Sequence, residues 1–242
     1  MPQSSLLFLY GCLAVFFLSN VAAIAFGKPS ADRTHRAIPW LQRSTSLQLA
    51  LMAWLFWGSG ARNTALATYA LLIAVGMSLS FIADLIMAEM IRLPNRVMGG
   101  IVVFGLAHLT YIGAYVSGGA ALGRLRPLLL SGSAVFWVAV GVVVWRRWVR
   151  HPSLAPLFNI SSLGYTLVIA VMVAVAGALA LAAGQLWLLL GGAISFFISD
   201  TILGNQIFHR HDWPYVSEVV WVTYILGQAG IVWSILLALR LL

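Results

Sequence analysis

Apolar residues occur along this chain in runs of about 20, separated by short segments that contain charged residues, proline and glycine. A helix of about 20 residues crosses the roughly 30 Å hydrocarbon core of a bilayer. The runs predict eight such helices, near residues 4–26, 44–58, 64–89, 97–117, 127–145, 161–183, 185–207 and 215–239. The pattern therefore predicts an all-α polytopic membrane bundle of eight transmembrane helices, folded as a single integral membrane domain over residues 1–242.

The composition supports a membrane protein and gives its orientation. Of 242 residues, 62% are hydrophobic and 8% are charged, and the net charge is +8. The loops after the first, third, fifth and seventh runs hold Lys28, Arg33, Arg36, Arg43, Arg92, Arg96, Arg146, Arg147, Arg150 and Arg210. The opposite side holds Arg62, Arg124, Arg126 and Arg240. The positive-inside rule then predicts termini outside the cytoplasm, in a plasma membrane such as the bacterial inner membrane, and we read the cations as topology signals rather than a nucleic-acid surface.

Cysteine and histidine usage excludes some kinds of site. The single cysteine, Cys12, forms no intrachain disulfide and no cysteine-based metal site. The segment His209-Arg210-His211-Asp212 fits a solvated loop better than a closed zinc shell, because two histidines at i and i+2 beside an arginine make a poor ligand set. We expect neither a metal nor a cofactor.

Two similar segments each place one aspartate within an apolar run. They are Phe81-Ile82-Ala83-Asp84-Leu85-Ile86 and Phe197-Ile198-Ser199-Asp200-Thr201-Ile202. The similarity continues in Thr110-Tyr111-Ile112 and Thr223-Tyr224-Ile225, at nearly the same spacing. This suggests two parallel four-helix repeats, with halves 1–120 and 121–242, that bring both aspartates to a similar depth near the cytoplasmic face. Chance similarity between two apolar helices is the alternative.

An aspartate inside a membrane requires a structural or chemical reason, because its insertion costs roughly 2.5 to 3.5 kcal/mol. No predicted helix contains lysine or arginine in its interior, and His108 is the nearest basic group. Two desolvated carboxylates close together favour one neutral acid beside one ionised partner, an arrangement used in acid and base catalysis. The structural alternative is that each aspartate only forms hydrogen bonds between helices.

Several polar residues accompany the two aspartates along the chain. Tyr111 and Tyr224 are expected to line the same cavity, although a packing role is open to both. Glu218 enters the last run near its cytoplasmic end, where it either contacts a ligand or reaches water. His108 is as consistent with a hydrogen bond between helices as with a base.

A known family resembles this pattern. Its likeness lies in Ser80 to Asp84, in Phe104 to Tyr111, in Gly192 to Asp200 and in Thr223 to Gln228, and it extends over the chain in the number and order of helices. These segments resemble the YhhN-like family of membrane lysoplasmalogenases. Ala83 departs from the glycine expected before the first aspartate, which bears on helix packing and not on the acid.

The resemblance implies a membrane hydrolase. Such an enzyme cleaves the vinyl ether of a lysoplasmalogen, releasing a fatty aldehyde and a glycerophospho head group, so the implied partners are a lysophospholipid substrate and membrane lipids. Carried over by position, Asp84 and Asp200 are the catalytic residues. The other expected substrate contacts or supporting residues are Ser80, His108, Tyr111, Ser199, Glu218 and Tyr224.

The implied chemistry agrees with the pair of carboxylates. Protonation of a vinyl ether gives an oxocarbenium ion that an anion stabilises and water attacks, as in glycoside hydrolysis. A proton-coupled secondary transporter that uses the same aspartates is the alternative function, because parallel repeats with buried acids also occur in carriers.

Overall fold

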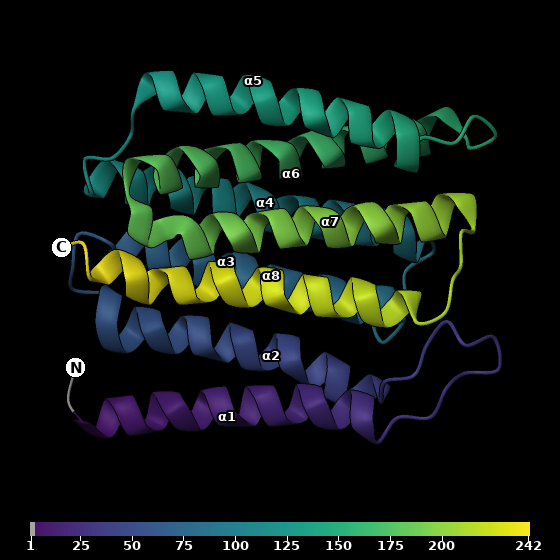
Figure 1. The fold of residues 1–242 in the computed structure, drawn as a ribbon, viewed down its shortest axis with the longest axis horizontal. Coiled ribbons are helices and arrows are strands. Elements are labelled where there is room, and N and C mark those ends of the chain that lie inside the picture. The colour runs from purple at the N-terminus through teal and green to yellow at the C-terminus, as the bar shows by residue number, and fades with distance from the viewer. Residues whose placement is uncertain (1–2) are drawn as a thin grey trace.

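The computed structural model describes residues 3–242, with side chains from Gly11 onward, and this part of the chain consists of helices and the loops that join them, without strands. Its main helices are α1 (Gln3–Ala25), α2 (Pro39–Phe56), α3 (Ala67–Met87), α4 (Arg96–Ala121), α5 (Pro127–Val144), α6 (Pro156–Ala182), α7 (Trp187–His209) and α8 (Val216–Leu239). Successive helices run in opposite directions, and the start of α1 and the end of α8 lie at the same end of the bundle (Figure 1). Within the described residues, eight helices are therefore confirmed.

Six of these helices, α3 to α8, are long and apolar enough to cross a membrane. The sequence predicts a short apolar run at residues 44–58, whereas α2 begins at Pro39 and is polar in its first half. Proline occupies the first turn of α2, α5 and α6, where its missing N–H breaks no helical hydrogen bond. Prolines that separate the apolar runs thus also start helices. The predicted second and sixth helices, at residues 44 and 161, therefore begin later in the sequence than the observed starts at Pro39 and Pro156.

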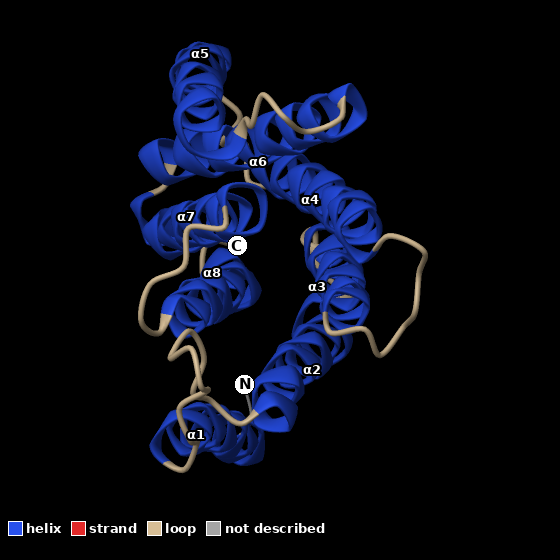
Figure 2. Cartoon of the chain, turned by 90° about the vertical axis from the view of Figure 1, so that its right-hand side faces the viewer, coloured by secondary structure: helices blue, strands red, loops and turns tan. Residues whose placement is uncertain are grey.

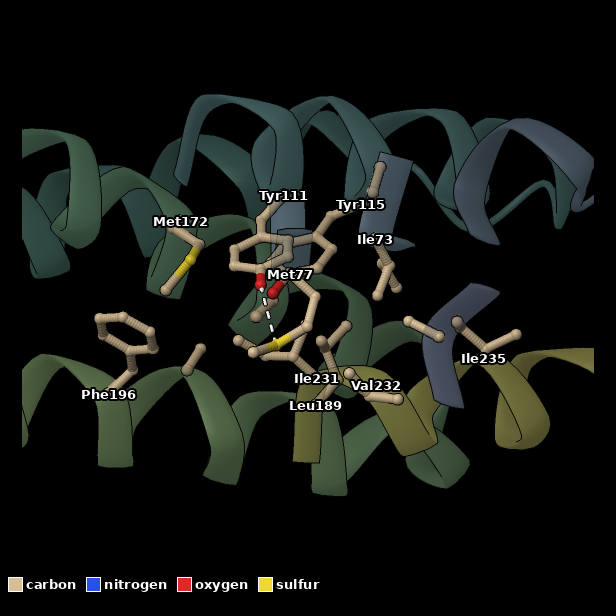
Figure 3. Close-up of a cluster of buried hydrophobic side chains, with 14 of the residues drawn as sticks. Ile73, Met77, Tyr111, Tyr115, Met172, Leu189, Phe196, Ile231, Val232 and Ile235 are labelled. Carbon is tan, nitrogen blue, oxygen red and sulfur yellow. Dashed lines mark hydrogen bonds between the residues drawn. The ribbon is translucent and has the colours of Figure 1, made fainter. Parts of the chain in front are cut away.

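Helices α3 and α4 face α7 and α8 across the centre of the bundle, while α1 and α5 lie at its two edges (Figures 1 and 2). Side chains from both pairs fill the centre, including Met77 and Tyr111 on one side and Phe196 and Ile231 on the other (Figure 3). All four are fully buried. This core separates the two ends of the bundle.

Glycine allows α7 and α8 to approach closely. A Cβ atom added to Gly192 would lie 2.7 Å from the carbonyl oxygen of Gly227 and 3.0 Å from the backbone nitrogen of Ile231. Only the absence of a side chain permits this backbone contact. The contact fixes Asp200 on α7 relative to Tyr224 on α8.

The loop between α1 and α2 is held against the start of α8. The backbone N–H groups of Tyr215 and Ser217 donate to the carbonyl oxygens of Arg33 and Thr34, at 2.8 and 3.1 Å. Because the helices alternate, the loops after α1, α3, α5 and α7, with the helix turns next to them, lie at this end of the bundle, and they carry ten of the lysine and arginine residues. The other four, Arg62, Arg124, Arg126 and Arg240, lie at the opposite end. That segregation is what the positive-inside rule uses to predict a cytoplasmic end.

Candidate active site

A polar cavity of about 360 Å³ lies between α2, α3, α4, α7 and α8, at the end of the bundle that carries the ten cations. Its wall is formed by His35, Pro39, Gln42, Arg43, Ser46, Asp84, Met87, Ala88, Phe104, Ser199, Asp200, Leu203, Val220, Trp221 and Tyr224. In Figure 2, α2, α3 and α4 lie on one side and α7 and α8 on the other. Asp84 and Asp200, 116 residues apart in the sequence, therefore face one space.

Asp84 lies near the C-terminal end of α3 and is held from α8. The Tyr224 hydroxyl donates to Asp84 Oδ2 at 2.8 Å, and the tyrosine oxygen accepts a long hydrogen bond from Gln228 Nε2 at 3.4 Å. Phe104 packs edge-on against the Tyr224 ring. One Asp84 oxygen is thereby bound by the protein, and the carboxyl group faces the polar cavity.

Asp200 on α7 is held by a different tyrosine, Tyr165 of α6. The Tyr165 hydroxyl donates to Asp200 Oδ2. His108 of α4 is fully buried, with its Nε2 atom 3.2 Å from the Tyr165 oxygen and 4.0 Å from Asp200 Oδ2. Because the only hydroxyl proton of Tyr165 is directed to Asp200, the His108 Nε2–H donates to the tyrosine oxygen. A chain of hydrogen bonds thus runs from His108 through Tyr165 to Asp200.

The two aspartates share the same kind of support but differ in their surroundings. Each accepts a tyrosine hydroxyl at Oδ2, and neither lies within ion-pair distance of a lysine or arginine of the described chain. Asp84 lines the polar cavity, whereas Asp200 lines both this cavity and a second space. The pair therefore has one member in polar surroundings and one at a boundary.

The second space is an apolar crevice of about 70 Å³ between α3, α4, α6 and α7, reaching the turn after α5. It is lined by Met87, Val97, Gly100, Ile101, Phe104, Val149, Ser162, Tyr165, Thr166, Ile169, Phe197, Asp200, Thr201, Leu203, Gly204, Ile207 and Phe208. Met87, Phe104, Asp200 and Leu203 line both spaces. Asp200 is the titratable group at this boundary.

Two of the predicted accessory residues lie on the wall of the polar cavity, Tyr224 and Ser199. The Ser199 hydroxyl donates to the carbonyl oxygen of Val220 at 2.8 Å, so it joins α7 to α8. His108 lies behind the wall, where it supports Tyr165. The sequence correctly groups these residues near the aspartates, and their catalytic roles stay predictions.

Ser80, Tyr111 and Glu218 lie elsewhere. The Tyr111 hydroxyl donates to Gln228 Oε1 at 2.8 Å and lies 3.4 Å from Ser80 Oγ, deep in the core (Figure 3). Tyr111 thus does not repeat the contact that Tyr224 makes with an aspartate. Glu218 Oε1 accepts the backbone N–H groups of Arg36 and Ala37, at 2.5 and 2.8 Å, and so anchors the α1–α2 loop.

Sequence reasoning missed Tyr165 and did not single out Arg43 or Gln42. A single tyrosine in an apolar helix has no distinctive pattern, and Tyr165 reaches Asp200 only because α6 packs beside α4 and α7. The polar first half of α2 is the signal that could have identified Gln42 and Arg43. Within the described residues, no group of three histidine, cysteine, aspartate or glutamate side chains is arranged to hold a metal ion.

Comparison with known proteins identifies the family of the chain. No curated protein and no solved structure matches it. The family model for YhhN, a family of membrane proteins that includes lysoplasmalogenases, matches residues 39–235 and thus covers α2 to α7 and most of α8. The protein belongs to the YhhN family.

Proposed function

We propose that this protein hydrolyses the vinyl ether bond of lysoplasmalogen-type lysophospholipids, releasing a fatty aldehyde and a glycerophospho head group. The observation that carries the proposal is the position of the two aspartates, which share one cavity at the junction of a polar and an apolar space. A vinyl ether lies between a polar glycerol and a hydrocarbon chain. Family membership supports the same activity.

The proposed reaction begins at Asp200, because this residue borders the apolar crevice where the alkenyl chain lies. The neutral Asp200 carboxyl gives its proton to the second carbon of the alkenyl chain. The electron pair of the double bond forms the new C–H bond, and the first carbon and ether oxygen share the positive charge of an oxocarbenium ion. Tyr165 holds Oδ2 and leaves Oδ1 for the transferred proton.

Asp84 serves as the carboxylate of the pair. Its charge stabilises the oxocarbenium ion across the cavity, and it accepts a proton from the water that attacks the first carbon. The resulting hemiacetal loses its hydroxyl proton to Asp200, and the glycerol oxygen leaves with a proton from Asp84. One water is consumed, and both carboxyl groups return to their starting states.

Hydrolysis of a purified lysoplasmenyl lipid tests the proposal. We expect aldehyde release by the wild type, loss of at least 100-fold in Asp84→Asn and Asp200→Asn, and unchanged turnover in Asp212→Asn, which alters an exposed loop carboxylate. In deuterated water the aldehyde should carry one deuterium on the carbon next to the carbonyl. Wild-type turnover in both folded site variants would contradict the acid-pair mechanism.

A proton-coupled transporter is the alternative function, and one observation favours it. A chain of buried polar groups runs from Asp84 through Tyr224 and Gln228 to Tyr111, in the direction of the opposite membrane face. Beyond Tyr111 the centre is filled by Tyr115, Ile231 and other apolar side chains (Figure 3). Solute uptake by proteoliposomes, in a protein that releases no aldehyde from any vinyl ether, would establish the alternative.

A further inference from the structure

The polar cavity contains a cation that no carboxylate neutralises. Arg43 lies in the second turn of α2 and lines the cavity, and it is partly buried. None of the six acidic side chains, all of which the structure describes, lies within ion-pair distance of its guanidinium group. The Arg43 backbone carbonyl accepts a hydrogen bond from Ser46 Oγ, whereas the guanidinium group takes part in none of the hydrogen bonds among the described residues. The guanidinium group is therefore available to pair with an anion that enters the cavity.

The surroundings of Arg43 add to the positive potential on this wall. The N-terminus of α2 has no side-chain cap, and Pro39 and Gln42 of its first turns face the cavity. His35 lies on the same wall, although its Nδ1 atom is 3.4 Å from Glu218 Oε1. Helix N-termini and arginine side chains both bind phosphate in proteins.

The apolar crevice determines what else the ligand contains. Met87, Phe104, Asp200 and Leu203 line both the crevice and the polar cavity, so the two spaces are adjacent. The crevice is small, at about 70 Å³, and its wall is mostly apolar, which favours a single hydrocarbon chain over a lipid with two. A ligand with a phosphate at one end and one chain at the other complements both spaces.

We infer that Arg43, together with the N-terminus of α2, forms a phosphate-binding subsite for the head group of a single-chain phospholipid whose chain enters the apolar crevice. This inference deepens the proposed function and rests on it for the reaction that takes place between the two ends. The subsite holds the phosphate on the α2 side of the cavity and away from the carboxylates, which would otherwise repel it. Arg43 therefore determines specificity for phosphorylated substrates and is not a catalytic residue.

Binding of non-hydrolysable ligands tests the subsite without requiring turnover. The full-length protein in nanodiscs is titrated with a saturated 1-O-alkyl lysophosphoethanolamine, with the matching 1-O-alkylglycerol, and with glycerophosphoethanolamine. The first ligand carries both a phosphate and a hydrocarbon chain, the second carries only the chain, and the third carries only the phosphate. Arg43→Ala should weaken the first ligand roughly 10- to 100-fold, as expected for a lost charge-assisted hydrogen-bonding pair, and leave the second within about twofold.

Matched variants separate phosphate recognition from folding. Arg62→Ala removes an exposed cation at the opposite end of the bundle and should leave all three affinities unchanged. Arg43→Gln keeps most of the side-chain volume and should show the same selective loss as Arg43→Ala, while Arg43→Lys should recover part of the binding. If Arg43→Ala does not fold, Arg43→Gln decides the question.

The outcomes distinguish this inference from the proposed function. Selective loss of the phosphorylated lipid supports the subsite, even if the wild type hydrolyses no vinyl ether and the proposed activity fails. The subsite is overturned if an Arg43 variant loses as much affinity for the alkylglycerol as for the lysophospholipid. It is also overturned if a folded variant loses affinity for neither ligand. Both conclusions hold even where aldehyde release is observed. Binding of glycerophosphoethanolamine as tight as that of the lysophospholipid would overturn the role of the crevice.

Discussion

Removal of a single oxygen atom, in Tyr165→Phe, should separate Asp200 from His108. The Tyr165 hydroxyl donates to Asp200 Oδ2 and accepts from His108 Nε2 at 3.2 Å, so the substitution removes two hydrogen bonds at once. A hydrogen bond to a charged group contributes about 1.5 to 3 kcal/mol. If that interaction stabilises the transition state, kcat should fall roughly 10- to 100-fold.

The same substitution should also lower stability, because His108 forms no other hydrogen bond with the described side chains. Its Nδ1 atom is already buried without a hydrogen bond, and loss of Tyr165 leaves the Nε2–H in the same condition. An unsatisfied buried polar group costs about 1 to 3 kcal/mol. We therefore expect a lower unfolding temperature for Tyr165→Phe, and much of this loss should be recovered in the double variant with His108→Phe.

Aldehyde release and thermal unfolding, measured in the same detergent, test this reasoning. Tyr224→Phe is the matched control at Asp84, where it removes one hydrogen bond of 2.8 Å. Tyr111→Phe is the control in the core, because it affects Gln228 and lies off the cavity wall; it should lower stability and leave kcat within about threefold. A Tyr165→Phe enzyme with wild-type kcat would refute a functional chain from His108 to Asp200. Additive effects of the Tyr165 and His108 substitutions on unfolding would refute their contact.

Three further substitutions test the packing and the loop. Gly192→Ala should destabilise the bundle by about 1 to 3 kcal/mol, because its Cβ would contact backbone atoms of α8, whereas Gly191→Ala, with nothing within 4 Å, should leave the unfolding temperature unchanged or raise it. Glu218→Ala should release the α1–α2 loop and accelerate its proteolysis, while Glu89→Ala, at an exposed ion pair, should not. Ile101→Trp should fill the apolar crevice and shift turnover toward substrates with shorter alkenyl chains. An unchanged preference for chain length would contradict the placement of the chain in the crevice. Thermal unfolding measures the effect of the glycine substitutions, limited proteolysis that of the glutamate substitutions, and substrate competition that of Ile101→Trp.

The helices were predictable because their signal is local. Twenty apolar residues in succession form a helix wherever they lie, and the structure contains helices in all eight predicted regions. Helix starts were less predictable, since Pro39 and Pro156 mark both the end of a loop and the first turn of a helix. Within the described residues, helices α3 to α8 have the length and hydropathy to cross a membrane.

The two aspartates were also identifiable, because a carboxylate in an apolar run conflicts with its surroundings and is therefore conspicuous. Their arrival at one cavity agrees with the predicted similarity of α3 and α7. The matching tyrosines were misleading, since Tyr224 binds Asp84 while Tyr111 binds Gln228. Whether the halves descend from a repeat stays a prediction.

The sequence by itself determined the helical membrane fold, the alternation of the helices and the acids of the site, because hydrophobic length and an isolated charge are properties of single segments. Only the tertiary structure decided which groups meet those acids. Tyr165 of α6 binds Asp200 and Arg43 of α2 lines the shared cavity, and both positions depend on how these helices pack rather than on any periodicity within them. The same packing places Asp200 between a polar and an apolar space, a boundary that no single helix contains.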